Sequence, residues 1–219
     1  MNRTGKAVSW SVWIGVALVA AMLALALALV KLKSVRAAQA PELPVISQVP
    51  AFALTNQLDQ PVTLENLKGR VWVADIIFTR CAGPCPAMTR KMRELQDALP
   101  ANSKTQLVTL TTDAEHDTSA VLLKYAEKFG AKSERWNFLT GGKAAIANLA
   151  IDGLKLTAVE KPAAERTDPV DLFVHSTIFV IVDKQGQLRG SFQTQGEMVD
   201  WAESKQQMLA TIKKLESEP

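Results

Sequence analysis

The sequence predicts an α/β domain with a mainly parallel sheet, preceded by one N-terminal transmembrane helix. Two apolar runs rich in β-branched residues, 71–78 and 176–183, have the composition of strands that are buried on both faces. Segments of helical periodicity alternate with strand-like segments between them, as in parallel sheets. The third observation is the run at 8–30, which has no charged residue and is long enough to cross a hydrocarbon core of about 30 Å.

The first 48 residues are predicted to form a short N-terminal segment at 1–7, a transmembrane anchor at 8–30 and a linker at 31–48. A cleaved signal peptide is the alternative, because residues 38–40, Ala-Gln-Ala, resemble a small-residue cleavage site. The apolar run is longer than a signal peptide requires, and three basic residues separate it from that site, which favours an uncleaved anchor. Basic residues flank both ends of the run, so the positive-inside rule does not decide its orientation.

The folded domain is predicted at 49–219. Residues 1–40 hold five of the 25 basic residues and none of the 22 acidic ones, so the remainder carries a net charge of about −2. No basic face for nucleic acid is indicated.

The domain begins with two short strands around a polar turn within 51–63, followed by a turn at 64–69. The central strand is predicted at 71–78. Asp75 interrupts its apolar run, so this carboxylate needs a hydrogen-bonding partner or a place near the accessible end of the strand.

A helix is predicted at 86–99, because apolar residues recur there at helical spacing and proline suits the first turn. Met88 and Met92 lie on its apolar stripe and are predicted to be core residues rather than metal ligands. The next elements are a strand at 105–111, a helix at 119–129 ending before Gly130, a strand at 136–140, a short helix at 144–150 and an edge strand at 154–159.

The last part of the chain starts with a polar, proline-containing surface loop at 160–171. The buried strand at 176–183 then turns back as a hairpin into 188–193. A final helix is predicted from about Gly196, with these residues on its apolar face: Met198, Trp201, Met208, Ile212 and Leu215.

The only two cysteines, Cys81 and Cys85, lie between the central strand and the helix that follows it. Open α/β sheets usually build their sites at this edge. The N-terminus of a helix stabilises a thiolate, so we expect lowered pKa values for the two thiols. Their spacing is compatible with a metal clamp or with a redox disulfide and does not separate the two.

His175 is the candidate third ligand, at the junction between the surface loop and a buried strand. Two thiolates and one imidazole suit Cu(I), and Cu(II) in a more tetragonal arrangement, while zinc accepts the same donors. The other histidine, His116, lies in a polar stretch and is interpreted as a solvated residue.

Four ordered motifs resemble those of the Sco/SenC family. Residues 78–86, FTRCAGPCP, resemble its F-T-x-C-x-x-x-C-P motif, and 111–118, TTDAEHDT, resemble its S-x-D-P-x-x-D-T segment. Residues 136–141, WNFLTG, are similar to its W-x-x-L-T-G, and His175 before an apolar strand is similar to its metal histidine. The chain has Ala-Gly-Pro between the cysteines in place of the commoner Pro-Asp-x.

The resemblance implies a thioredoxin-like, copper-binding domain whose ligands fall on Cys81, Cys85 and His175. It also implies membrane anchoring, with the soluble domain in the periplasm or an equivalent compartment. The expected role is to deliver copper, as Cu(I) or Cu(II), to the CuA centre of cytochrome c oxidase, or to keep the thiols of that centre reduced. The implied partners are the oxidase subunit carrying CuA and a copper donor.

A membrane-tethered thiol-disulfide oxidoreductase that uses the Cys81 and Cys85 pair is the alternative function. The usual thioredoxin motif has two residues between its cysteines, whereas this chain has three. Whether the protein is an enzyme therefore stays open at this stage.

Overall fold

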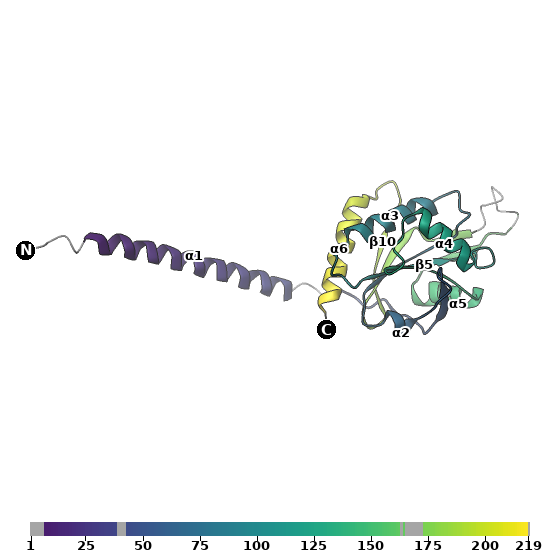
Figure 1. The fold of residues 1–219 in the computed structure, drawn as a ribbon, viewed down its shortest axis with the longest axis horizontal. Helices are drawn as coiled ribbons and strands as arrows, with labels where there is room; N and C mark the ends of the chain where they lie inside the picture. Colours follow the sequence, from purple (N-terminus) through teal and green to yellow (C-terminus); the bar gives the residue numbers. More distant parts are fainter. Residues whose placement is uncertain (1–6, 39–42, 163, 165–172, 219) are drawn as a thin grey trace, which may run out of the picture. The chain divides into compact units, whose positions relative to one another are not determined.

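The computed structural model describes residues 7–38, 43–162, 164 and 173–218. Internal contacts divide the chain into two units, Met1–Leu43 and Pro44–Pro219. The first unit contains α1 (Ala7–Ala38), in which Val12–Lys31 is long and apolar enough to cross a membrane (Figure 1). An N-terminal signal sequence can also be apolar enough and long enough to meet this criterion.

The second unit is built on one sheet of eight described strands, whose order is β1-β10-β9-β4-β5-β6-β2-β3. Their bounds are β1 (Ser47–Gln48), β2 (Ala53–Asn56), β3 (Pro61–Thr63), β4 (Trp72–Ile77), β5 (Gln106–Thr111), β6 (Trp136–Thr140), β9 (Ile178–Val182) and β10 (Gln187–Gln193).

Among the described strands, only the β4–β5 and β5–β6 pairings are parallel, so the sheet is mixed and the expectation of a mainly parallel sheet is wrong. The reason is that β2–β3 and β9–β10 are hairpins, whose short connections force antiparallel pairing. β9 also lies antiparallel to β4. The predicted hairpins and the buried central strand are confirmed.

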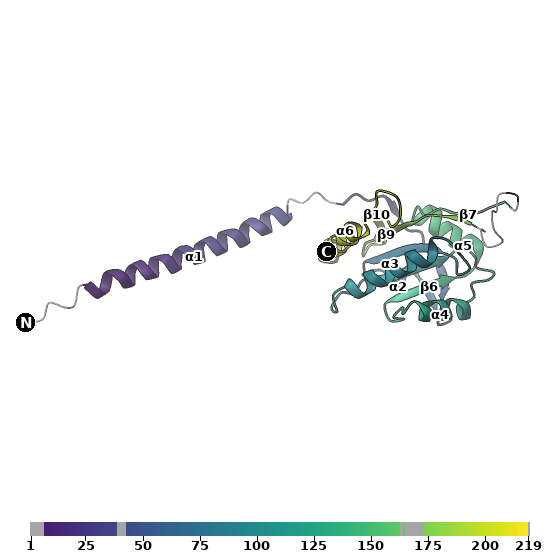
Figure 2. The same cartoon turned by 90° about the horizontal axis from the view of Figure 1, so that it is seen from above.

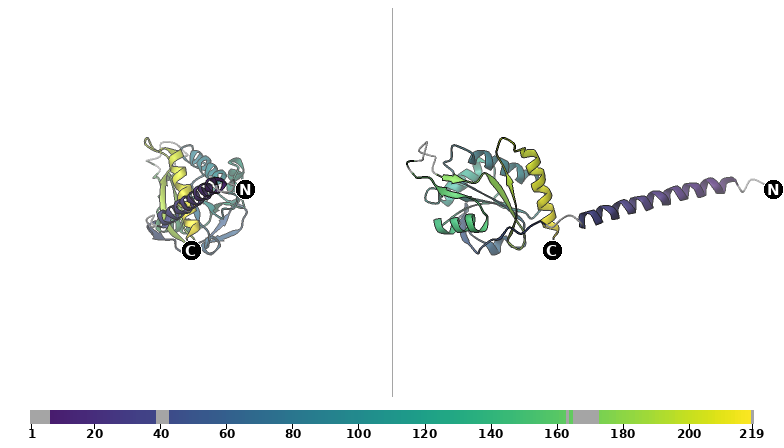
Figure 3. Two further views of the ribbon diagram at one scale, coloured as in Figure 1. Left: turned by 90° about the vertical axis from the view of Figure 1, so that its left-hand side faces the viewer. Right: turned by 180° about the vertical axis from the view of Figure 1, so that it is seen from behind.

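β4 lies in the middle of the sheet, and all six of its residues are buried. Alternate residues point to opposite faces, so Trp72, Ala74 and Ile76 join a core cluster with residues of α2 (Leu64–Leu67) and α5 (Lys143–Ala147). The opposite face is covered by α3 (Cys85–Ala98) and α6 (Trp201–Ser217), as Figures 1 and 3 show. Asp75 is therefore on the face that α3 covers.

The remaining predicted helices are present with small shifts. α4 (Ser119–Lys128) ends before Gly130, whose φ of +68° suits glycine. α5 continues into a π-helical turn at Asn148–Gly153. α3 and α6 lie side by side (Figure 2), and the indole Nε1 of Trp201 donates to Glu94 at 2.8 Å.

Two predictions about the last third of the chain are wrong. The predicted edge strand pairs outside the main sheet: β7 (Ala158–Glu160) and β8 (Phe173–His175) form a separate two-stranded antiparallel sheet. The final helix begins at Trp201, where the Asp200 side chain accepts hydrogen bonds from the first turn. Met198 is consequently outside the helix and 99% exposed. The predicted loop at 160–171 lies mostly outside the described residues.

Candidate functional site

The two cysteines lie where β4 ends and α3 begins. Cys81 is in the connecting loop, and its N–H donates to the carbonyl of Phe78 at 3.2 Å. Cys85 is the first residue of α3, directly after Pro84. Both thiols are reduced and buried, with Cys81 9% and Cys85 0% exposed. The Cys81 side chain lies within hydrogen-bonding reach of the Cys85 thiol, so the fold places the two sulfur atoms close together.

The pKa of Cys85 is raised, which contradicts the expectation of a thiolate at the helix N-terminus. The largest cause is the hydrogen bond with the Cys81 side chain, and burial comes second. The charges of Cys81 and Asp75 act in the same direction, while a backbone hydrogen bond at Phe78 opposes them. A metal ion bound here therefore has to displace a proton from Cys85.

The loop that carries Cys81 is held by the buried carboxylate of Asp117. This carboxylate accepts hydrogen bonds from both the N–H and the hydroxyl of Thr79, and from the hydroxyl of Thr111. Because Asp117 follows β5, the residues between β5 and α4 fix the residues between β4 and α3. Sequence reasoning matched Asp117 to a family segment without giving it this role.

Next to Asp117, a second contact fixes the residue that precedes Cys81. Arg80 forms a salt bridge with Asp113 at 2.5 Å, and the Asp113 side chain is 9% exposed. The guanidinium donates through both Nε and Nη2 to the same oxygen.

Asp113, His116 and Asp117 have donor atoms within 4.8 Å of one another, a spacing that could hold a metal ion. Their oxygens already accept from Arg80, Thr79 and Thr111. The Nδ1 atom of His116 lies 3.0 Å from Asp117, and its side chain is 41% exposed. We interpret this cluster as the scaffold of the cysteine loop.

The structure describes the backbone of His175, at the end of β8 opposite Ala158, and its side chain lies outside the described part. A series of contacts connects this region with the cysteine loop. Two residues after His175, the carbonyl of Thr177 accepts from the N–H and hydroxyl of Thr194. The adjacent Gln195 donates to the carbonyl of Pro84 at 3.2 Å.

In β4, which precedes the cysteine loop, Asp75 belongs to a buried polar network. Its Oδ1 accepts from the hydroxyl of Thr109 at 2.7 Å, and that hydroxyl accepts from the indole Nε1 of Trp136 at 2.9 Å. Asp75 therefore has the hydrogen-bonding partner that the sequence required of it.

Together these features define a thioredoxin-like domain with a reduced cysteine pair between its central strand and the following helix. The chain belongs to the SCO1/SenC family, whose model matches residues 43–215. It is 35% identical over 147 residues to the SCO1 protein homolog of Bacillus subtilis strain 168, covering 66% of this chain and 73% of that protein. It is also 34% identical over 150 residues to a Stutzerimonas stutzeri protein named provisionally as copper-binding, covering 68% and 70% of the two.

Solved structures agree with this assignment. A SCO1/SenC family lipoprotein from Bacillus anthracis str. Ames superposes with a TM-score of 0.69 at 28% identity, covering 80% of this chain and 99% of that one. BsSco, described as a Sco family cytochrome c oxidase assembly protein with a disulfide switch, superposes with a TM-score of 0.67 at 29% identity, covering 83% and 100%.

Proposed function

We propose that this protein binds copper through Cys81, Cys85 and His175 during the assembly of cytochrome c oxidase. In this role it delivers copper to the CuA centre or keeps the thiols of that centre reduced. Copper is then cargo that the protein passes to a partner.

The contact between the two cysteine side chains carries the proposal. The two sulfurs supply two of the three proposed soft-metal ligands, and an imidazole suits the same ions. The contacts from Thr177 through Thr194 and Gln195 to Pro84 support His175 as the third donor, because they tie the segment after β8 to the loop between the cysteines.

The relatives agree with copper as the cargo. The Stutzerimonas stutzeri protein bears a copper-binding name, and BsSco is described as a cytochrome c oxidase assembly protein. By analogy, the partners are the oxidase subunit carrying CuA and a copper donor. We further propose that α1 anchors the chain and that the soluble domain is on the periplasmic side, or in an equivalent compartment.

A thiol-disulfide exchange function is the second candidate, since reduced sulfurs in contact can also form a disulfide. One cysteine of this chain, as thiolate, would attack a disulfide of the partner and form a mixed disulfide. The other would attack that bond and release the partner as a dithiol. Two electrons and two protons pass to the partner, and this chain is left with a Cys81–Cys85 disulfide.

The deciding experiment measures copper affinity of the full-length protein in detergent micelles. His175→Ala is expected to weaken Cu(I) or Cu(II) binding by more than about tenfold, since losing even an outer-shell partner of a ligand costs about 10–100-fold. Lys124→Ala is the control, because it truncates an exposed side chain on α4 and should leave the affinity unchanged. Unchanged affinity for both ions in His175→Ala would refute the three-ligand site.

A separate assay tests the redox candidate. The reduced protein is mixed with a model disulfide, and the appearance of its dithiol product is followed. Turnover at a rate typical of thioredoxins, lost in Cys81→Ser and Cys85→Ser and kept in His175→Ala, would place thiol exchange ahead of copper delivery.

A further inference from the structure

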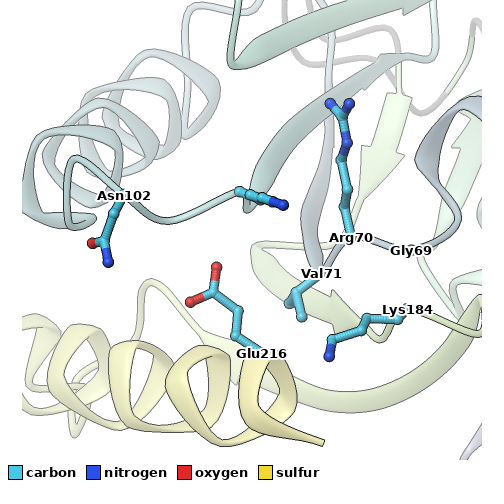
Figure 4. A pocket seen from close by; sticks show the side chains of 7 residues that line it. Gly69, Arg70, Val71, Asn102, Lys184 and Glu216 are labelled. Carbon is cyan, nitrogen blue, oxygen red and sulfur yellow. The ribbon is translucent and has the colours of Figure 1, made fainter. Parts of the chain in front are cut away.

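A hollow of about 310 Å³ lies in the domain at the end of β4 opposite the cysteines. Its charged and polar lining residues are Arg70, Asn102, Lys104, Lys184 and Glu216. Figure 4 shows Asn102 and Glu216 on one side and Arg70 and Lys184 on the other. Arg70 precedes β4 closely, whereas Cys81 follows it, and the six residues of the strand span about 20 Å. The hollow is therefore distinct from the thiol site.

The lining is positively charged. Three cationic side chains face one carboxylate, which leaves a net charge of +2. Within the described residues, the side chains of Arg70 and Lys104 take part in no ion pair and no hydrogen bond, and both residues are exposed. Two cations and the amide of Asn102 are thus available as donors to a ligand.

The one carboxylate is already bound to the protein. Oε1 of Glu216 accepts from the hydroxyl of Ser103 at 2.7 Å and from that of Thr105 at 2.8 Å. These bonds connect the last turn of α6 to the segment that carries Asn102 and Lys104.

Backbone hydrogen bonds hold the other walls in place. The N–H of Gly69 donates to the carbonyl of Lys184 at 2.9 Å, and the N–H of Gln106 donates to the carbonyl of Val71 at 3.0 Å. The ammonium group of Lys184 donates to the carbonyl of Glu218. A ligand therefore meets a preformed pocket and orders mainly Arg70 and Lys104.

We propose that this hollow is a binding site for a phosphate group. A phosphate monoester carries about −1.5 to −2 charges at pH 7 and offers three acceptor oxygens, which matches the net lining charge and the available N–H donors. The group could come from free phosphate or from a phospholipid headgroup with a terminal phosphate, and both present the same chemistry to the site.

The test measures how fast Lys104 reacts with an amine-specific reagent in the full-length protein, quantified by mass spectrometry. In detergent micelles, inorganic phosphate at ten times its Kd should slow this reaction about tenfold, because a bound anion covers the amine. Sodium chloride at matched ionic strength should not. Lys124, exposed on α4, is the internal control and should react at an unchanged rate.

The lipid source is tested with the same reaction in nanodiscs of phosphatidylcholine alone or with added phosphatidic acid. Slowing only by phosphatidic acid assigns the ligand to a headgroup, and slowing by inorganic phosphate in micelles assigns it to soluble phosphate. Arg70→Glu should raise the Kd for inorganic phosphate or for phosphatidic acid about tenfold. Lys124→Glu, the same charge reversal outside the hollow, should leave both Kd values unchanged. Equal reactivity of Lys104 under all conditions, or equal slowing by chloride, would overturn the proposal.

Discussion

The buried carboxylate of Asp117 accepts two hydrogen bonds from Thr79, one from its N–H and one from its hydroxyl. The two residues are 38 positions apart, and Thr79 lies two positions before Cys81. The geometry of the cysteine loop thus depends on a residue from a neighbouring part of the sheet edge.

Asp117→Asn should destabilise the protein by about 1–3 kcal/mol, since an amide cannot accept at both positions and leaves a buried donor without a partner. Chemical denaturation measures this loss. If the copper proposal holds, copper affinity should fall as well, because Thr79 no longer fixes the loop. Asp97→Asn, which alters an exposed pair with Arg93, should change stability by less than about 1 kcal/mol. Equal effects of the two variants would contradict this role of Asp117.

Thr109→Val should destabilise the domain by about 1–3 kcal/mol. The substitution keeps the shape but removes the hydroxyl that donates to Asp75 and accepts from Trp136. Thermal unfolding of Thr109→Val and Thr109→Ser measures the loss, since serine keeps the hydroxyl. A valine variant as stable as the serine variant would show that the network contributes nothing.

Glu94→Gln should show a pH-dependent loss of stability. The hydrogen bond from Trp201 and the contact with Lys205 lower the pKa of Glu94 below its ordinary value of 4.5. Because the folded-state pKa is the lower one, the stabilisation is present above the unfolded value and is lost as pH falls through the folded value. The side chain is 50% exposed, so the effect at pH 7 should stay below about 1 kcal/mol.

This prediction is tested by measuring the free energy of unfolding between about pH 3 and about pH 7. This range includes the ordinary carboxyl pKa of 4.5. The difference between the wild type and Glu94→Gln should shrink toward acid. Glu197→Gln, on an exposed loop, should give a difference near zero throughout. A difference for Glu94→Gln that grows toward acid would have the wrong sign.

Two methionines from one predicted stripe should respond in opposite ways to the same substitution. Met208 is 0% and Met198 is 99% exposed. Met208→Ala should cost about 2–5 kcal/mol through the cavity it leaves, while Met198→Ala should stay within about 0.5 kcal/mol. Urea unfolding of both variants checks the contrast, and a large cost at Met198 would be inconsistent with its exposure.

The order of strands and helices was predictable because buried strands and helical stripes leave strong periodic patterns. The antiparallel pairing of β9 with β4 could not be predicted from composition, because β9 is as apolar as a parallel strand. Met198 was assigned to a helix because its spacing fits, whereas the capping side chain of Asp200 starts the helix later.

The sequence located the cysteine pair, but it did not predict the protonation of Cys85. A helix N-terminus favours a thiolate, yet contact with Cys81 and burial outweigh it. Contact with Cys81 and burial both depend on tertiary packing, which no local sequence pattern records. The support from Asp117 was missed for the same reason. A carboxylate in a polar stretch of sequence does not indicate which distant groups donate hydrogen bonds to it.

The first strand of the domain, β1, joins the sheet at the Trp72 end of β4, through β10 and β9. Cys81 follows the other end of that strand. β1 and the two cysteines are therefore at opposite ends of β4. The length of β4, about 20 Å, therefore separates the start of the domain from the cysteine loop.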